Sequence, residues 1–214
     1  MKKPLSPPHD CPLCPRLVAF REDNRKKHPD WFNGPVPNFG PLTARLLIAG
    51  LAPGLQGANR TGRPFTGDWA GDLLYDTLLK LGLAKGTYEE RADDTLELVD
   101  CRIANSVHCV PPQNKPEPSE IRTCRQFLSS ELETLPNVKV ILALGKIAHD
   151  SVCDALGAKK KQHPFKHGMS YEKVGKYTLI SSYHCSRYNT NTGVLTTEMF
   201  VDVVAKAKRL ASIP

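Results

Sequence analysis

The sequence VKVILALG at residues 138–145 decides the fold class more clearly than any other stretch of the chain. It is a short apolar run that ends in a glycine. Such a run predicts a strand buried on both faces, which is typical of parallel sheets covered by helices. Residues 146–156, directly after this glycine, are expected to form the helix that follows the strand.

Three further apolar runs predict strands within residues 45–50, 96–107 and 177–183. Helices are expected over residues 15–27, 71–83, 119–135 and 196–211, the third of them capped by Ser119. We therefore predict one α/β domain over residues 1–214, with a central four-stranded parallel sheet and helices on both faces. In such sheets, ligands bind beyond the carboxyl ends of the strands.

The charge balance favours an anionic partner. Lys and Arg number 29 against 22 Asp and Glu, which gives a formal charge of +7 and suits nucleic acid, a phosphorylated ligand or an acidic membrane surface. No apolar run approaches the about 20 residues that span a bilayer. The opening MKKPLSPPHD has no apolar stretch behind its lysines, so it is not a secretory signal. We expect a cytoplasmic protein that does not bind membranes.

The chain contains seven cysteines, and an odd number without an export signal argues against a disulfide framework. Cys11 and Cys14 form a CxxC, whereas Cys109 and Cys124 lie far downstream. The four together suit a four-thiolate site for zinc or a [4Fe–4S] cluster, which would tie the Pro-rich residues 1–41 to the middle of the chain. Taken alone, the two downstream cysteines are better explained as ordinary buried thiols. Two others, at positions 101 and 153, are predicted to lie in the core.

Polar residues gather in the loops that follow the first and last predicted strands. Residues 57–68 (GANRTGRPFTGD) contain glycines that let a backbone approach a ligand, and they match neither a P-loop nor a dinucleotide fingerprint. Residues 183–195 are almost entirely polar. Asn105, near the end of the second strand, offers a hydrogen-bond donor and acceptor. Because these strand ends meet at one edge of a parallel sheet, they predict a functional site there.

Three of these residues also have ordinary structural interpretations. Asp68 is a good N-cap for a helix beginning near residue 69, and that role can coexist with a functional one. Asn105 is equally consistent with a hydrogen-bonded residue at a sheet end. A single His184 in a turn-forming run is more often structural, but its place at the sheet edge favours function.

Four motifs in order resemble the uracil-DNA glycosylase superfamily and, within it, family 5, the iron–sulfur-containing type B enzymes. They are GLAPG at residues 50–54, GANRTGRPFTGD at 57–68, NSVHCVPPQNKP at 105–116 and H-x-S-R-x-NTNTG at 184–193, with four cysteines in the family's order. The resemblance covers nearly the whole chain and implies the same four-stranded parallel sheet. Unlike related families, type B enzymes have no polar side chain in GLAPG. This chain departs from the family at Cys185, where a proline is usual.

The resemblance implies a catalytic role for Asp68, which would oppose positive charge on the sugar or orient the attacking water. His184 would donate to the leaving base, and Asn189 would hold the distorted DNA backbone. The implied substrate-binding residues are Gly50, Ala52, Gly54, Phe65, which would stack on an extruded base, Asn105, which would bond the base edge, and Leu195, which would fill the vacated stack. The implied ligands of a structural [4Fe–4S] cluster are Cys11, Cys14, Cys109 and Cys124.

The implied function is monofunctional DNA repair: removal of uracil and deaminated purines such as hypoxanthine, leaving an abasic site. DNA is the expected partner, with double-stranded DNA as the main substrate and single-stranded DNA as a further one. The protein is expected to be a monomer. Two alternatives remain open. One is a narrow uracil enzyme like those of family 4, and the other is a non-catalytic nucleic-acid-binding module stabilised by zinc or a cluster.

Overall fold

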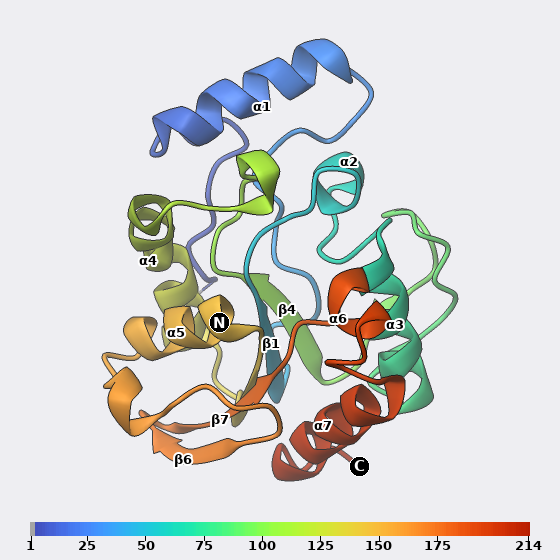
Figure 1. Cartoon of the computed structure of the whole chain (residues 1–214), viewed down its shortest axis with the longest axis vertical. Coiled ribbons are helices and arrows are strands. Elements are labelled where there is room, and N and C mark those ends of the chain that lie inside the picture. Colours follow the sequence, from blue (N-terminus) through green and yellow to red (C-terminus); the bar gives the residue numbers. More distant parts are fainter. Residues whose placement is uncertain (1–2) are drawn as a thin grey trace.

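A computed structural model describes residues 3–214 of the chain (Figure 1). Its main sheet has five strands in the order β4-β1-β5-β7-β6. The four predicted strands form and are mutually parallel where they pair: β1 (Leu46–Gly50), β4 (Cys101–Asn105), β5 (Val140–Leu144) and β7 (Tyr177–Ser182).

The prediction of four strands was incomplete, because β6 (Ser170–Val174) pairs antiparallel with β7 at the edge of the sheet. Its sequence SYEKV is largely polar and mostly solvent-accessible, so it lacks the apolar run that marks the other strands. Two short strands, β2 (Ala84–Lys85) and β3 (Glu97–Leu98), form a separate hairpin pair.

The predicted helices are present within a few residues of their expected bounds. They are α1 (Pro15–Lys27), α3 (Trp69–Lys80), α4 (Pro118–Thr134), α5 (Lys146–Ala155) and α7 (Thr197–Leu210). Helix α4 starts earlier than predicted: Glu117, not Ser119, precedes its first turn, and the Glu120 carboxylate accepts from the Glu117 backbone N–H at 2.7 Å. The short helices α2 (Ala58–Thr61) and α6 (Arg187–Asn191) and the 3₁₀ turns Pro112–Asn114 and Lys160–Gln162 were not predicted.

Alternate residues of the buried strands pack into two separate hydrophobic cores, one on each face of the sheet. On β1, Leu46 and Ile48 pack in the core that includes residues of α3 and α7, whereas Leu47 and Ala49 pack in the core that includes residues of α4 and α5. Figure 1 shows these helix pairs on opposite sides of the strands. Cys101 and Cys153 are fully buried in these cores, which confirms the prediction for both thiols.

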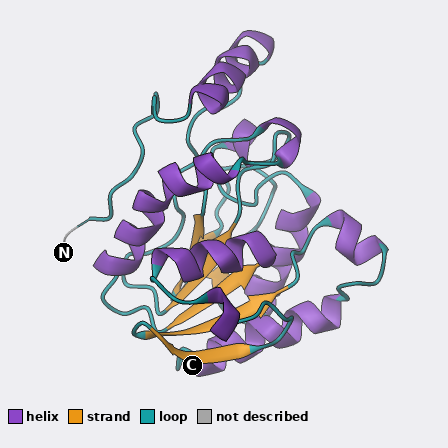
Figure 2. Ribbon diagram, turned by 60° about the vertical axis from the view of Figure 1, so that its left-hand side comes forward, coloured by secondary structure: helices purple, strands orange, loops and turns teal. Residues whose placement is uncertain are grey.

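Figure 2 shows the strands with helices in front of and behind them. Because β4, β1, β5 and β7 run parallel, their carboxyl ends lie at one edge of the sheet. There Gly50, the last residue of β1, pairs with Asn105, the last residue of β4. Helix α1 lies beyond this edge, away from the sheet, and the Arg16 side chain joins it to Glu120 of α4 at 2.7 Å. Among residues 3–214, no helix is both long and apolar enough to cross a bilayer.

Candidate active site

A cavity of about 430 Å³ opens at the carboxyl edge of the sheet. Most of the residues predicted to form the site line this cavity: Ala52, Gly54, Phe65, Asp68, Asn105 and His184. They come from the ends of three strands, so the parallel topology, and not sequence proximity, brings them together. The volume lies within the range of sites that bind small molecules.

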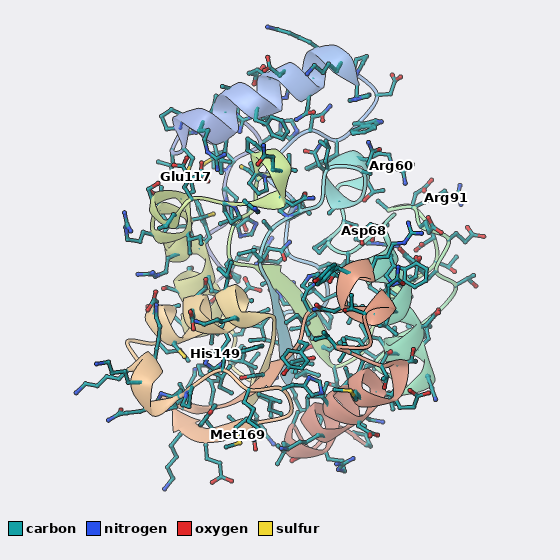
Figure 3. All side chains as sticks on the ribbon, viewed as in Figure 1. Arg60, Asp68, Arg91, Glu117, His149 and Met169 are labelled. Atoms are coloured by element: carbon teal, nitrogen blue, oxygen red, sulfur yellow. The ribbon has the colours of Figure 1, made fainter. Side chains whose placement is uncertain are left out.

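Asp68 has both of the roles that the sequence suggests. As the N-cap of α3, it accepts from the Gly71 backbone N–H through Oδ1 at 3.1 Å. Its other oxygen, Oδ2, lies against the backbone of Gly54 and Gly57, where an added Cβ would come within 2.9 Å and 2.4 Å of it. The two glycines therefore leave room for a carboxylate oxygen beside the cavity. Asp68 itself is labelled in Figure 3, at the start of α3.

Phe65 and Asn105 meet over Gly50. A Cβ on Gly50 would lie 2.3 Å from the Asn105 Oδ1 atom and 3.0 Å from the Phe65 ring, so only glycine fits here. Gly50 thus shapes the site without lining the cavity. The Asn105 Oδ1 atom is buried and has no hydrogen-bond partner among residues 3–214. A buried acceptor without a partner is costly, and it lines a cavity where a ligand donor would satisfy it.

The conformation of Phe65 is held from beneath by a buried ion pair. Phe65 has φ +52°, which a non-glycine residue rarely adopts. Two residues before it, Arg63 makes two hydrogen bonds to Asp94, of 2.6 and 2.7 Å. The guanidinium also lies between 5.3 and 5.8 Å from the ring centres of three aromatic residues, Phe39, Tyr75 and Tyr88.

Hydrogen bonds further stabilise the segment that carries Phe65. Burial alone would raise the pKa of Asp94, but its bonds from Arg63 and from two backbone N–H groups hold it at about 2. The Tyr88 hydroxyl accepts from the Gly67 N–H at 3.1 Å, and the Tyr75 hydroxyl donates to the Pro64 carbonyl at 2.5 Å. The segment that carries Phe65 and Asp68 is therefore fixed by groups outside the cavity.

His184 follows β7 and faces Phe65 across the cavity, with ring centres 6.1 Å apart and planes inclined by 28°. Burial lowers the pKa of His184, and the Asp68 carboxylate opposes this shift only in part. The imidazole is therefore neutral at pH 7, with one nitrogen protonated and able to donate. Gly145 lies close to the His184 Cβ, which a side chain at position 145 would approach at 3.4 Å.

Besides Gly50, two predicted residues do not line the cavity, Asn189 and Leu195. The Asn189 side chain donates to the His184 carbonyl at 2.8 Å, so it positions the loop that carries His184. Leu195 was wrongly predicted to fill a vacated base stack, because its side chain is fully buried in the core beside α7. A residue that enters a DNA stack must be exposed. The residues before Leu195 are mostly polar, so the sequence predicted an exposed loop and gave no sign that the chain turns into the core at this position.

Several lining residues were missed by the sequence analysis, among them Trp69, Asn114 and Arg187. The Arg187 guanidinium lies 5.8 Å from the Trp69 ring centre, and the Trp69 indole N–H donates to Thr190 at 3.0 Å. These contacts join α6 to the first turn of α3. The signal that distinguishes this rim is the exposure of the Trp69 side chain, which is 48% accessible. The exposure of a side chain cannot be read from the sequence.

Cys185, where a proline was expected, is fully buried next to this rim. Its thiol donates to the Ala70 carbonyl at 3.4 Å and so links the His184 loop to α3. Burial raises the pKa of Cys185, so the thiol stays protonated and is no nucleophile.

The four remaining cysteines, Cys11, Cys14, Cys109 and Cys124, line a second, small apolar cavity. Residues distant in sequence, including Leu17 of α1 and Phe127 of α4, form its walls. Burial raises the pKa of Cys124 to about 12 and that of Cys109 to about 11. Within residues 3–214, no three His, Cys, Asp or Glu side chains stand close enough to hold a single metal ion.

A cavity at the carboxyl ends of parallel strands, lined by a carboxylate, an imidazole and an amide, has the groups that a hydrolytic enzyme needs. The family model described as "Uracil DNA glycosylase superfamily" matches residues 37–208. The chain belongs to this superfamily.

Curated relatives share most of the chain. It is 48% identical to the type-5 uracil-DNA glycosylase of Thermus thermophilus, covering 95% of this chain and 94% of the relative. It is 38% identical to the type-5 enzyme of Pyrobaculum aerophilum over 92% of this chain and 88% of that one. Identity to the type-4 uracil-DNA glycosylase of Thermotoga maritima is 31%, over 79% of each chain.

Proposed function

We propose that this chain removes uracil and deaminated purines from DNA by hydrolysing the N-glycosidic bond, leaving an abasic site. The observation that carries this proposal is the convergence of the free Asp68 oxygen, the neutral His184 ring and the unpaired Asn105 amide around one cavity. The relatives named above support uracil as a substrate. Access for larger purines is supported by the cavity volume and by the apolar walls of Leu51 and Ala52.

The reaction needs the base outside its stack, at a cost of a few kcal/mol in duplex DNA. Phe65 stacks on the extruded base and Asn105 bonds its edge. As the bond from the sugar C1′ to the base nitrogen breaks, its electron pair leaves with the base, where the His184 N–H stabilises the negative charge. Asp68 opposes the positive charge on the sugar and orients the water that adds to C1′.

Tyr188 takes the place assigned to Leu195. Its side chain is 74% exposed, on α6 at the rim of the cavity, next in sequence to the lining residue Arg187. A large exposed ring at this rim suits the vacated space in a duplex. Within the described chain, no packing contact explains why so large a ring is placed at the surface.

The four cysteines Cys11, Cys14, Cys109 and Cys124 line one small cavity with apolar walls. Four thiols around one cavity support the proposal that they hold a [4Fe–4S] cluster. The cluster would act structurally, joining the N-terminal segment to the segment after β4.

Single-turnover cleavage of labelled duplexes containing uracil or hypoxanthine tests the function. We expect alkali-dependent strand breaks with both bases, and Asp68→Asn is expected to lower the rate about a hundredfold or more while leaving DNA binding largely intact. Breaks with uracil alone would indicate the narrower enzyme. DNA binding without breaks would indicate a binding module, and near-normal cleavage by Asp68→Asn would remove this residue from the mechanism.

A further inference from the structure

Arg21 is a buried cation that base excision does not use. Its side chain is 4% exposed, although it lies on the helix α1, which ends in exposed lysines such as Lys26. Arg21 follows Leu17 by one helical turn, so both point to the same face, toward the cysteine cavity that Leu17 lines. Burying a guanidinium costs several kcal/mol unless neighbouring groups compensate its charge.

The described chain supplies little of that compensation. The Arg21 Nη1 atom donates to the Cys11 carbonyl at 3.1 Å, but its Nε atom is buried without a hydrogen-bond partner. A carboxylate oxygen of Glu22 lies 3.6 Å from Nε. That carboxylate is about half exposed and also binds Arg25 at 2.9 Å. A buried guanidinium with an unused donor indicates a missing anionic partner.

The group beside Arg21 is the cysteine cavity itself. The hydrogen bond from its Nη1 atom to the Cys11 carbonyl ties Arg21 to one of the four cysteines that line this cavity. Four thiolates around an iron–sulfur core leave a net negative charge, and here they lie in apolar surroundings where a cation interacts strongly.

We propose that Arg21 is the charge-compensating residue of the cluster, with its guanidinium donating to the cluster sulfurs. This inference rests on the proposed [4Fe–4S] cluster. Hydrogen bonds and net charge around a cluster set its reduction potential, and the groups that orient its ligands govern its retention. Arg21 therefore favours the more reduced cluster and slows its loss.

The test compares full-length wild type, Arg21→Gln, Arg21→Lys and the matched control Lys26→Gln, which removes an exposed charge from the same helix. Iron and sulfide content, the rate at which a chelator bleaches the visible absorption, and the reduction potential are measured. We expect Arg21→Gln to bleach about 10–100-fold faster and to shift the potential to more negative values. Arg21→Lys keeps the positive charge, so its reduction potential should stay close to that of wild type. It should bleach faster than wild type, because an ammonium lacks the planar set of N–H donors of a guanidinium. The control should match wild type.

The outcomes separate this inference from the cluster itself. Iron-free wild type would overturn the cluster proposal, and the role of Arg21 with it. Iron-loaded wild type with unchanged bleaching and potential in Arg21→Gln would overturn only the role of Arg21. Where Arg21→Gln does not fold, Arg21→Lys decides: bleaching equal to wild type would contradict the inference.

Discussion

Two loops carry the reacting groups, and they are held in opposite ways. Phe65 and Asp68 belong to the loop between β1 and α3, which rests on the Arg63–Asp94 pair, whose side chains are at most 5% exposed. His184 belongs to the loop after β7, which continues into the five residues of α6. The buried Cys185 ties the start of that second loop to α3, whereas α6 itself has no buried residue and is held by contacts near the surface, including the hydrogen bond from Trp69 to Thr190.

The difference assigns a task to each loop. Buried charged and aromatic contacts are costly to disrupt, so the first loop keeps the cavity in one shape before DNA arrives. Segments with few buried contacts open at lower free-energy cost, so α6 is the part of the second loop that is able to adjust as a duplex is distorted. In the proposed reaction, the preformed loop would recognise the base and α6 would meet the DNA around it.

Removing the ion pair is the strongest way to break this comparison. Arg63→Met leaves the buried Asp94 carboxylate without its partner, and we expect a loss of about 3–5 kcal/mol in the free energy of unfolding. Single-turnover cleavage should fall as well, because the Phe65 and Asp68 backbone loses its support. Urea unfolding measures the first effect, and labelled duplexes measure the second.

The matched control is Arg91→Gln, which breaks the exposed pair with Glu89 in the same part of the chain. Its stability should equal that of wild type, because exposed pairs contribute little. Replacing both buried partners, in Arg63→Met with Asp94→Asn, should recover part of the loss. Equal stability of Arg63→Met and Arg91→Gln would show that the first loop is not held as described.

On the adjustable loop, Tyr188→Ala tests the contact with the vacated stack. We expect single-turnover cleavage of a uracil duplex to fall about tenfold, since part of the unstacking cost is then uncompensated. Cleavage of single-stranded DNA should not change, because no paired stack is vacated there. Equal losses on both substrates would contradict the role of Tyr188 and point to a general disturbance of α6.

The smallest expected effect concerns acid stability on the far face of the sheet. His149 is fully buried between Ser181, at 2.8 Å from Nδ1, and the His163 carbonyl, at 2.8 Å from Nε2, and burial lowers its pKa below 6.5. As pH falls below about 6.5, the unfolded chain binds a proton that the folded chain does not, so stability declines until the folded pKa is passed.

Melting temperatures between about pH 7.5 and pH 5.5 measure this decline. His149→Asn should be less stable than wild type at neutral pH but should lose less stability on acidification. His184 shares the same direction of pKa shift, so part of the pH dependence will remain. An unchanged slope in His149→Asn would exclude this residue as a source of acid sensitivity.

The sequence by itself determined the parallel sheet, the helices that cover it and most of the site. Apolar runs such as residues 138–145 are local signals, and a strand buried on both faces has few alternatives. Asn105 and His184 were predictable for the same reason: each lies at or next to a strand end, and parallel strands bring such ends together. Asp68 was predictable as the last residue of the glycine-rich loop that follows β1. The edge strand β6 has no such apolar run, because most of its side chains are at least partly exposed to solvent.

Only the tertiary structure decided which side chains of the polar loops face the cavity. Leu195 and Tyr188 lie seven positions apart in one run, and long-range packing alone buries the first and exposes the second. The pairs Arg63–Asp94 and Arg16–Glu120 likewise join segments far apart in the chain. Such contacts depend on how the helices and loops pack together, and local sequence patterns do not encode that arrangement.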